Sequence, residues 1–259
     1  MDAALVGCTL EFDVTEPAEI ALQIAAASPA TEKLTLSADV PVREIPGRQH
    51  LVRVPKGILT VTYEATVPLG DPPPPVSDVD RILAGRPSRY CPSDRLGGFA
   101  LSRFGGFGDD TAATVRAITD WVFGHLAYQG GVSGPTTDAV DTLLAGAGVC
   151  RDYAHLVVTL CRACDIPARV AAVYAPGLSP MDFHLVAEAA IDGRWTVWDA
   201  TRLAPRQTLM RIVTGRDAAD TALATTLSGM LTLPRTEILA VAAGDLPFDD
   251  HHELVQLRG

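Results

Sequence analysis

The sequence contains no stretch of about 18 uncharged apolar residues, the length that a membrane-spanning helix needs. Its first residues, MDAALVGCTLEFDV, lack the basic start and sustained apolar core of a secretory signal, which predicts a cytoplasmic protein. Positive charge is also scarce, because 21 Lys and Arg face 31 Asp and Glu for a net charge of −10. A surface of this sign opposes binding along a phosphate backbone. We therefore expect neither a membrane nor a nucleic acid as a partner.

Cysteine is sparse and odd in number. The chain carries only Cys8, Cys91, Cys150, Cys161 and Cys164. An odd set in a chain of 259 residues favours free thiols over a disulfide framework. Three common catalytic signatures are missing as well, namely Gly-x-Ser-x-Gly, the phosphate-binding loop and His-Glu-x-x-His. Their absence removes sequence support for a nucleophile-elbow serine hydrolase, a P-loop nucleotidase and a zinc protease.

What is present is the composition of a folded chain, with 47% hydrophobic and 20% charged residues. Residues 1–75 contain short alternating apolar runs separated by Pro and Gly, which predict a β-sandwich-like antiparallel domain. These runs are Thr9–Val14, Leu34–Val40, His50–Val54 and Leu59–Val67. The segment Gly70–Pro75 ends in four consecutive prolines, which neither a helix nor a sheet can cross. We therefore expect a domain boundary there, followed by a second domain over residues 76–259.

The second part begins with a glycine-rich, loop-like stretch and then shows helical periodicity. Apolar residues spaced by three and four predict a helix that starts near Asp110. Two further helices are expected, over Thr137–Ala145 and over Arg151–Cys164, where Pro167 stops the second of them. The stripe on that last helix is apolar enough to predict a core helix.

Strands follow the core helix. Apolar runs predict them over Ala168–Tyr174, His184–Ile191 and Arg194–Thr201, and the last two are joined by Asp192-Gly193, a dipeptide typical of a two-residue hairpin turn. The tail predicts a short helix near Asp217–Leu223 and strands over Thr226–Leu233 and Ile238–Ala242. The whole chain is therefore expected to have an α+β fold, with an antiparallel β domain preceding an α/β domain.

Cys150 lies at the expected start of the core helix, shortly after Gly146 and Gly148. The unpaired amides at a helix N-terminus favour negative charge, so this position favours the thiolate, which is the reactive form of cysteine. The amide of Cys150 itself is free to point at a developing oxyanion. The alternative is that Cys150 is a small buried apolar residue, as most free cysteines are.

The expected hairpin supplies a base and a carboxylate. If Ile191 and Arg194 flank the turn, His184 and Asp199 lie on the same sheet face as diagonal neighbours, about 7 to 8 Å apart between Cα atoms. The carboxylate can then orient the imidazole, which takes the thiol proton and later protonates the leaving group. Each residue also has a structural alternative, a hydrogen bond within the sheet for His184 and a turn cap for Asp199.

Other polar residues near these positions are weaker candidates. Glu188 shares the face of His184 but lies about 13 Å along the strand, and Asp182 could lean toward the ring from the preceding loop. His155 is about 140° around the helix from Cys150, so it is poorly placed as a base. Tyr128 and Gln129 precede the nucleophile in a loop and are candidate oxyanion donors.

Two further groups favour a structural interpretation. Cys161 and Cys164 both lie on the buried stripe, and no second pair completes four metal ligands, so core packing is favoured over metal or redox chemistry. His251 and His252 lie in an acidic tail, where we expect them to be exposed to solvent.

Four segments in a fixed order resemble one known family. They are Gly148–Leu156, Cys164–Arg169, Asp182–His184 and Trp195–Thr201, and together they are similar to the bacterial transglutaminase-like superfamily. The separations fit too, since His184 follows Cys150 by 34 residues and Asp199 follows His184 by 15. The resemblance is clearest from about Trp121 to Arg206. Where the family often has His-Ala-Trp, Asp-Pro-Thr and Gly-Ile-Pro, this chain has His-Leu-Val, Asp-Ala-Thr and Asp-Ile-Pro, and Asp165 must adopt the turn that glycine would make.

The resemblance implies a papain-like α/β catalytic domain that needs no organic cofactor, preceded by the β region that often accompanies it. It also implies that Cys150 is the nucleophile, His184 the general base and acid, and Asp199 the residue that orients the imidazole. Acyl transfer through a thioester on Cys150 follows, with hydrolysis of a peptide or protein amide as the expected reaction. Two alternatives stay open: amide formation with an amine acceptor, and a non-catalytic binding module on the same fold.

Overall fold

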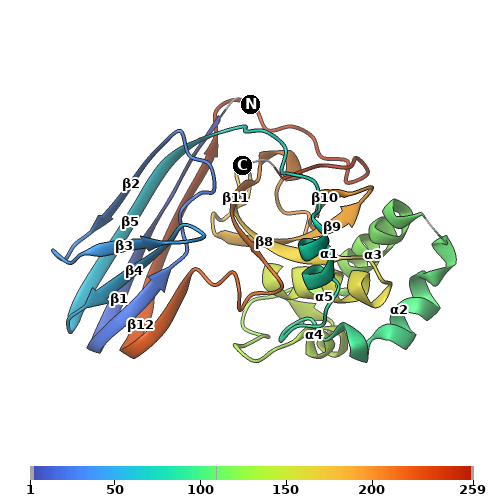
Figure 1. The fold of residues 1–259 in the computed structure, drawn as a ribbon, viewed down its shortest axis with the longest axis horizontal. Coiled ribbons are helices and arrows are strands. Elements are labelled where there is room, and N and C mark those ends of the chain that lie inside the picture. The colour runs from blue at the N-terminus through green and yellow to red at the C-terminus, as the bar shows by residue number, and fades with distance from the viewer. Residues whose placement is uncertain (1–2, 109, 258–259) are drawn as a thin grey trace.

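A computed structural model of the chain describes residues 3–108 and 110–257 (Figure 1). Its first sheet is antiparallel and curled, with the order β2-β5-β1-β4-β3 and β12 on the other edge of β1. The strands are β1 (Ala3–Leu22), β2 (Thr31–Leu36), β3 (Val42–Ile45), β4 (Gln49–Val54), β5 (Gly57–Pro68) and β12 (Ala224–Ala242). Residues 69–77, which include the four prolines, form neither helix nor strand, as their composition predicts.

The long strand β1 organises this sheet. Alternate residues such as Leu10, Phe12 and Val14 are buried in one core cluster, whereas Asp13 and Thr15 between and beyond them are exposed. Gly7 allows β1 to approach β5, because a Cβ at this position would lie 2.4 Å from the Tyr63 carbonyl oxygen. The period-two pattern of the sequence therefore reflects one buried and one more open face.

The tail differs from the prediction. The two expected strands over 226–233 and 238–242 form one continuous strand, β12, that pairs antiparallel with β1. Pro234 lies where the register with β1 shifts, so the strand accommodates a residue without an amide donor by a bulge. The expected helix over 217–223 is a turn, because Asp217 accepts the Ala219 amide and closes the chain locally.

These pairings bear on the expected division of the chain. Residues 224–242 lie in the first sheet, although the boundary at residue 75 places them in the second domain. The division into domains 1–75 and 76–259 stays a prediction, and the first sheet is built from both ends of the chain.

The second unit consists of a four-stranded antiparallel sheet with the order β10-β9-β8-β11 and of several helices, most of which pack against one face of it. The strands are β8 (Ala168–Tyr174), β9 (Phe183–Ile191), β10 (Arg194–Trp198) and β11 (Met210–Gly215), and a parallel pair is formed by β6 (Ala127–Tyr128) and β7 (Ala147–Gly148). The helices are α1 (Asp78–Ala84), α2 (Gly97–Phe104), α3 (Thr111–His125), α4 (Ala139–Ala145) and α5 (Cys150–Ala163), with short 3-10 turns at Ser93–Arg95, Gly105–Phe107 and Arg206–Thr208.

The local sequence explains most of these boundaries. Asp110 caps α3, Asp138 caps α4, and Gly146 ends α4 in the left-handed conformation. Helices α1 and α2 lie where the sequence predicts loops, since Gly97 and Gly98 begin a helix here instead of breaking one. Asp165 has a φ of 60°, so it adopts the turn expected of a glycine. The core helix α5 packs against β8 and β9, as its apolar stripe predicts.

The two sheets meet through a shared core. Tyr174, Met210 and Ile212 of the second sheet belong to the same buried cluster as the first sheet, and the Tyr174 hydroxyl donates to the Ile24 carbonyl at 2.7 Å. The fold is therefore α+β, with the first sheet and the helices α2–α5 packed against different parts of the second sheet (Figure 1). No helix within residues 3–108 and 110–257 is long and apolar enough to cross a membrane.

Candidate active site

Cys150 is the first residue of α5 and is half-buried. The strand pair just before it fixes its approach, because Tyr128 of β6 lies beside Gly148 of β7 and the Gln129 amide donates to the Gly148 carbonyl at 2.9 Å. Gly148 is required there, since a Cβ would lie 2.6 Å from the Cβ of Asp152. The thiol therefore stands at the tip of a buried helix, as the sequence predicts. All five cysteines are free.

Asp152 fixes the backbone around the thiol. Its carboxylate is fully buried and accepts the Val149 amide at 2.9 Å and the Ser133 hydroxyl at 2.6 Å. Its other oxygen accepts from Arg151, whose guanidinium also donates to the Gly134 carbonyl. These bonds hold the start of α5 and the glycine-containing loop near it in one arrangement.

His184 lies on β9, Asp199 directly follows the neighbouring strand β10, and their side chains meet. The hairpin register opposes Arg194 with Ile191, and the turn residues Asp192 and Gly193 both have positive φ, as expected for this dipeptide. Strand β10 ends before the expected Thr201, and Asp199 directly follows its last residue. The His184 Nε2 lies 2.8 Å from the Asp199 Oδ2.

The contact is buried on both sides, with His184 and Asp199 exposed by 2% and 3%. The other oxygen of Asp199 accepts from the amide and the hydroxyl of Thr201 at 2.9 and 2.7 Å. Burial by itself raises the pKa of Asp199, but His184 and Thr201 outweigh that effect and lower it, so the carboxylate stays charged.

The pKa of the His184 imidazole shifts upward, opposite to that of Asp199. Burial disfavours the charged ring, but the negative charge of Asp199, its hydrogen bond and the side chain of Cys150 raise the pKa of His184 to about 10. Because a carboxylate only accepts, Nε2 carries the proton of the Asp199 contact and Nδ1 is left without a hydrogen-bond partner in the described part of the chain. Cys150 and Asp199 thus both act on one buried imidazole, and such a ring can exchange a proton with a thiol.

The weaker candidates occupy other environments. Glu188 is fully buried and accepts from Arg169 and Arg211, so its charge is already compensated away from His184. Asp182 is exposed and accepts the amide of Phe183. His155 is buried, and its Nε2 accepts the Ala218 amide at 3.0 Å, a structural role that agrees with its predicted position on the helix.

Tyr128 lies near the thiol, as proposed for an oxyanion donor. Burial and the negative charge of Cys150 raise the pKa of Tyr128 to about 12, although the Cys150 amide acts in the opposite sense. The hydroxyl is therefore protonated at neutral pH and able to donate. Cys161 is fully buried in the core cluster and Cys164 packs against it, as predicted. Within residues 3–108 and 110–257 no group of three His, Cys, Asp or Glu side chains is placed to hold a metal ion.

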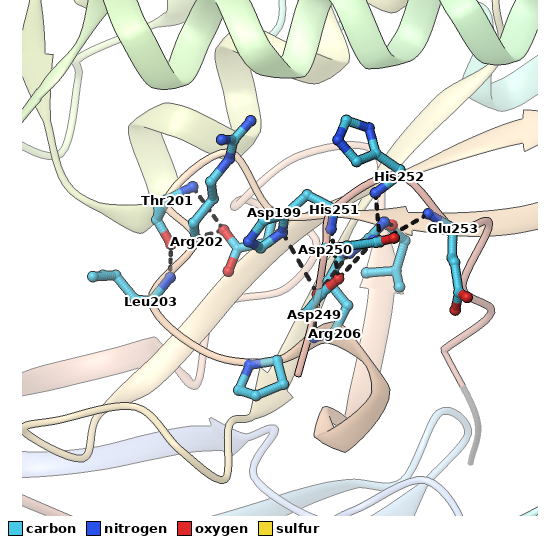
Figure 2. A network of polar contacts seen from close by, with 12 residues as sticks. Asp199, Thr201, Arg202, Leu203, Arg206, Asp249, Asp250, His251, His252 and Glu253 are labelled. Carbon is cyan, nitrogen blue, oxygen red and sulfur yellow. Dashed lines mark hydrogen bonds and ion pairs between the residues drawn. The ribbon is translucent and has the colours of Figure 1, made fainter. Parts of the chain in front are cut away.

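The sequence did not indicate that the C-terminal segment reaches this site. Figure 2 shows Asp249 and its neighbours beside the loop that carries Asp199 and Arg202. His251 was expected in solvent but is half-buried, because the Asp249 carboxylate, fixed by Arg206, accepts its amide at 2.9 Å. His252 is exposed as expected. A buried Arg–Asp pair separated by 43 residues leaves no periodic signal in a sequence.

Comparisons with known proteins show the family of the chain. A sequence model described as the Transglutaminase-like superfamily matches residues 102–200, which include all three triad candidates. A crystal structure described as a "putative cysteine protease" from Cytophaga hutchinsonii is 31% identical, with a TM-score of 0.87 over 98% of this chain and 96% of that one. The chain therefore belongs to the transglutaminase-like superfamily and has its α+β fold.

Two other proteins are more distantly similar. An uncharacterized protein from Mycobacterium leprae is 27% identical over 161 residues, and the match covers 57% of this chain and 55% of that relative. The chain thus spans about half the length of this curated relative. The periplasmic domain of TgpA from Pseudomonas aeruginosa is 18% identical over 77% of this chain and 90% of that chain, with a TM-score of 0.43.

Proposed function

We propose that this protein is a thiol peptidase or amidase that hydrolyses a peptide or protein amide through a thioester on Cys150. In this proposal Cys150 is the nucleophile, His184 the general base and acid, and Asp199 the residue that orients and charges the imidazole. The supporting observation is the buried contact between His184 and Asp199 at 2.8 Å, on an imidazole whose second nitrogen has no other partner in the described chain. The Cys150 side chain acts on that same ring.

The reaction follows from these groups. The Cys150 thiolate attacks the amide carbonyl carbon, and the oxyanion that develops faces the Cys150 amide and the Tyr128 hydroxyl. His184 gives its proton to the leaving nitrogen as the carbon–nitrogen bond breaks, which leaves an acyl group on sulfur. His184 then takes a proton from water as water attacks the thioester, and the thiol leaves with that proton. Asp199 stabilises the imidazolium in both halves of the cycle.

The first test concerns the nucleophile and needs no known substrate. Cys150 and Cys164 are both half-buried, so exposure is matched, and only Cys150 lies beside His184. Limited iodoacetamide followed by peptide mapping should label Cys150 first near neutral pH, and His184→Ala should slow that labelling. Equal labelling of the two cysteines, or an unchanged rate in His184→Ala, would favour a binding module without catalysis.

The second test concerns the acceptor. Mass spectrometry of a peptide library incubated with the protein should show hydrolysed products, and Cys150→Ala should abolish them without changing the melting temperature appreciably. Added primary amine distinguishes the alternative reaction, because an amidated product in place of the acid identifies an acyltransferase. A cytoplasmic location and a peptide or protein substrate are part of this proposal.

A further inference from the structure

The carboxylate proposed to orient the imidazole follows an edge strand. In the sheet order β10-β9-β8-β11, β10 pairs with β9 on one side only. Asp199 comes directly after its last residue, Trp198. An edge strand keeps free backbone groups on its outer side and is less constrained than an inner one. Some other element must therefore fix the end of β10 if Asp199 is to be held within hydrogen-bond distance of His184.

Residues 249–257, here called the C-terminal strap, occupy that outer side. Val197 lies two residues before Asp199, and its amide donates to the Val255 carbonyl at 2.8 Å. Leu257 is almost fully buried and packs in a cluster with Val197. The strap is fastened to α3 as well, since Arg116 donates to the His252 carbonyl at 2.9 Å.

One buried ion pair fixes the start of the strap. Arg206 donates from Nε and Nη2 to the two carboxylate oxygens of Asp249, each at 2.9 Å, and its amide donates to the same carboxylate at 2.9 Å. The side chains are exposed by only 1% and 3%. Arg206 also donates from Nη1 to the Val197 carbonyl at 3.2 Å and lies near the Trp198 ring. Both backbone groups of Val197 are thus bound by the strap or by the arginine that the strap holds.

We propose that Arg206 and Asp249 are positioning residues for Asp199, acting through Val197 and the end of β10. This inference rests on the proposed function, because it assigns the pair to the orientation of the proposed His184–Asp199 contact. Loss of the pair loosens the edge strand, lengthens that contact and weakens the support that Asp199 gives to the charged imidazole. The thiolate of Cys150 is then formed only at higher pH.

The test compares Asp249→Asn with Asp220→Asn. Asp220 accepts the same three donors from Arg216, namely the amide, Nε and Nη2, but in a partly exposed position. In Asp249→Asn, alkylation of Cys150 by iodoacetamide at neutral pH should slow by about 10- to 100-fold, and the midpoint of its pH profile should move upward. Asp220→Asn should match the wild type in both. A folded Asp249→Asn with the rate and midpoint of Asp220→Asn would overturn the inference.

Two further measurements keep the test decisive if Asp249→Asn does not fold. Arg206→Lys keeps the charge but loses the paired donors, and it should shift the pH profile in the same direction. Hydrogen exchange in the wild type should protect the Val197 amide as strongly as the amides of β9, and rapid exchange there would refute the role of the strap. If the wild type does not label Cys150 before Cys164, the proposed function fails by itself, and the exchange measurement still decides the contact between strap and strand.

Discussion

Replacing Asp199 with asparagine should separate orientation from charge at the proposed active site. The Asp199→Asn side chain keeps the shape of the original and can still accept from Thr201, but the negative charge 2.8 Å from the His184 Nε2 is gone. Two unit charges at that distance interact by about 6 kcal/mol at an effective dielectric constant of ~20. Removing one member of a buried ion pair costs about 3 to 5 kcal/mol after the burial penalty is included.

That range corresponds to a reaction about 10²- to 10⁴-fold slower at neutral pH. The assay is the second-order rate of Cys150 alkylation as a function of pH, with the titration of the His184 ring followed by NMR. We expect the imidazole of Asp199→Asn to titrate at lower pH and the alkylation profile to move to higher pH. Asp182→Asn is the control, since Asp182 is exposed and close in sequence to His184. If Asp199→Asn retained the rate and both profiles of the wild type, Asp199 would have no part in charging the ring.

Three other properties of the protein test the roles of His184, Gly148 and Glu188. The raised pKa of His184 contributes stability that is fully present below pH 6.5, the ordinary pKa of histidine, and is lost as the pH rises toward about 10. The melting temperature of the wild type should therefore fall over that pH interval, and that of Asp199→Asn should fall less. Gly148→Ala should lower the free energy of unfolding by about 1 to 3 kcal/mol because its Cβ meets a carboxylate side chain. Gly124→Ala has open space around it and lies in helix α3, so it should not lower the free energy of unfolding and should raise it by up to about 1 kcal/mol. Glu188→Gln should destabilise the fold by about 3 to 5 kcal/mol, because it removes the buried negative charge that compensates Arg169 and Arg211. Cys150 in the folded variant should still be alkylated at nearly the wild-type rate, and a large fall in that rate would reassign Glu188 to the site.

The local parts of the fold could be predicted from the sequence. The core helix α5 follows from its apolar stripe, and the hairpin register follows from Asp192-Gly193, because both depend on residues close together in the chain. The predicted register places His184 and Asp199 on one face of the sheet as neighbours, and in the structure their side chains are in contact.

The non-local parts could not be predicted. The residues of β12 predict two ordinary strands, and nothing in them indicates that they form one strand whose partner is β1. The partner of the strap could not be predicted either. In the sequence Asp249 is one of several acidic residues in an acidic tail, and only the structure shows that it pairs with Arg206. Such pairs are determined by tertiary packing, and the periodicity and turn residues of a sequence give no information about tertiary packing.

The pairing of β1 with β12 has a consequence for how the protein is made. Ala4 lies opposite Ala242, so this part of the sheet joins residues that are far apart in the sequence and leave the ribosome at very different times. Until β12 has been synthesised, one edge of β1 has no partner strand. A nascent or truncated chain therefore exposes a long unpaired strand edge to other molecules. Fragments that end before residue 224 should therefore aggregate during expression, even when all the helices α1–α5 are present.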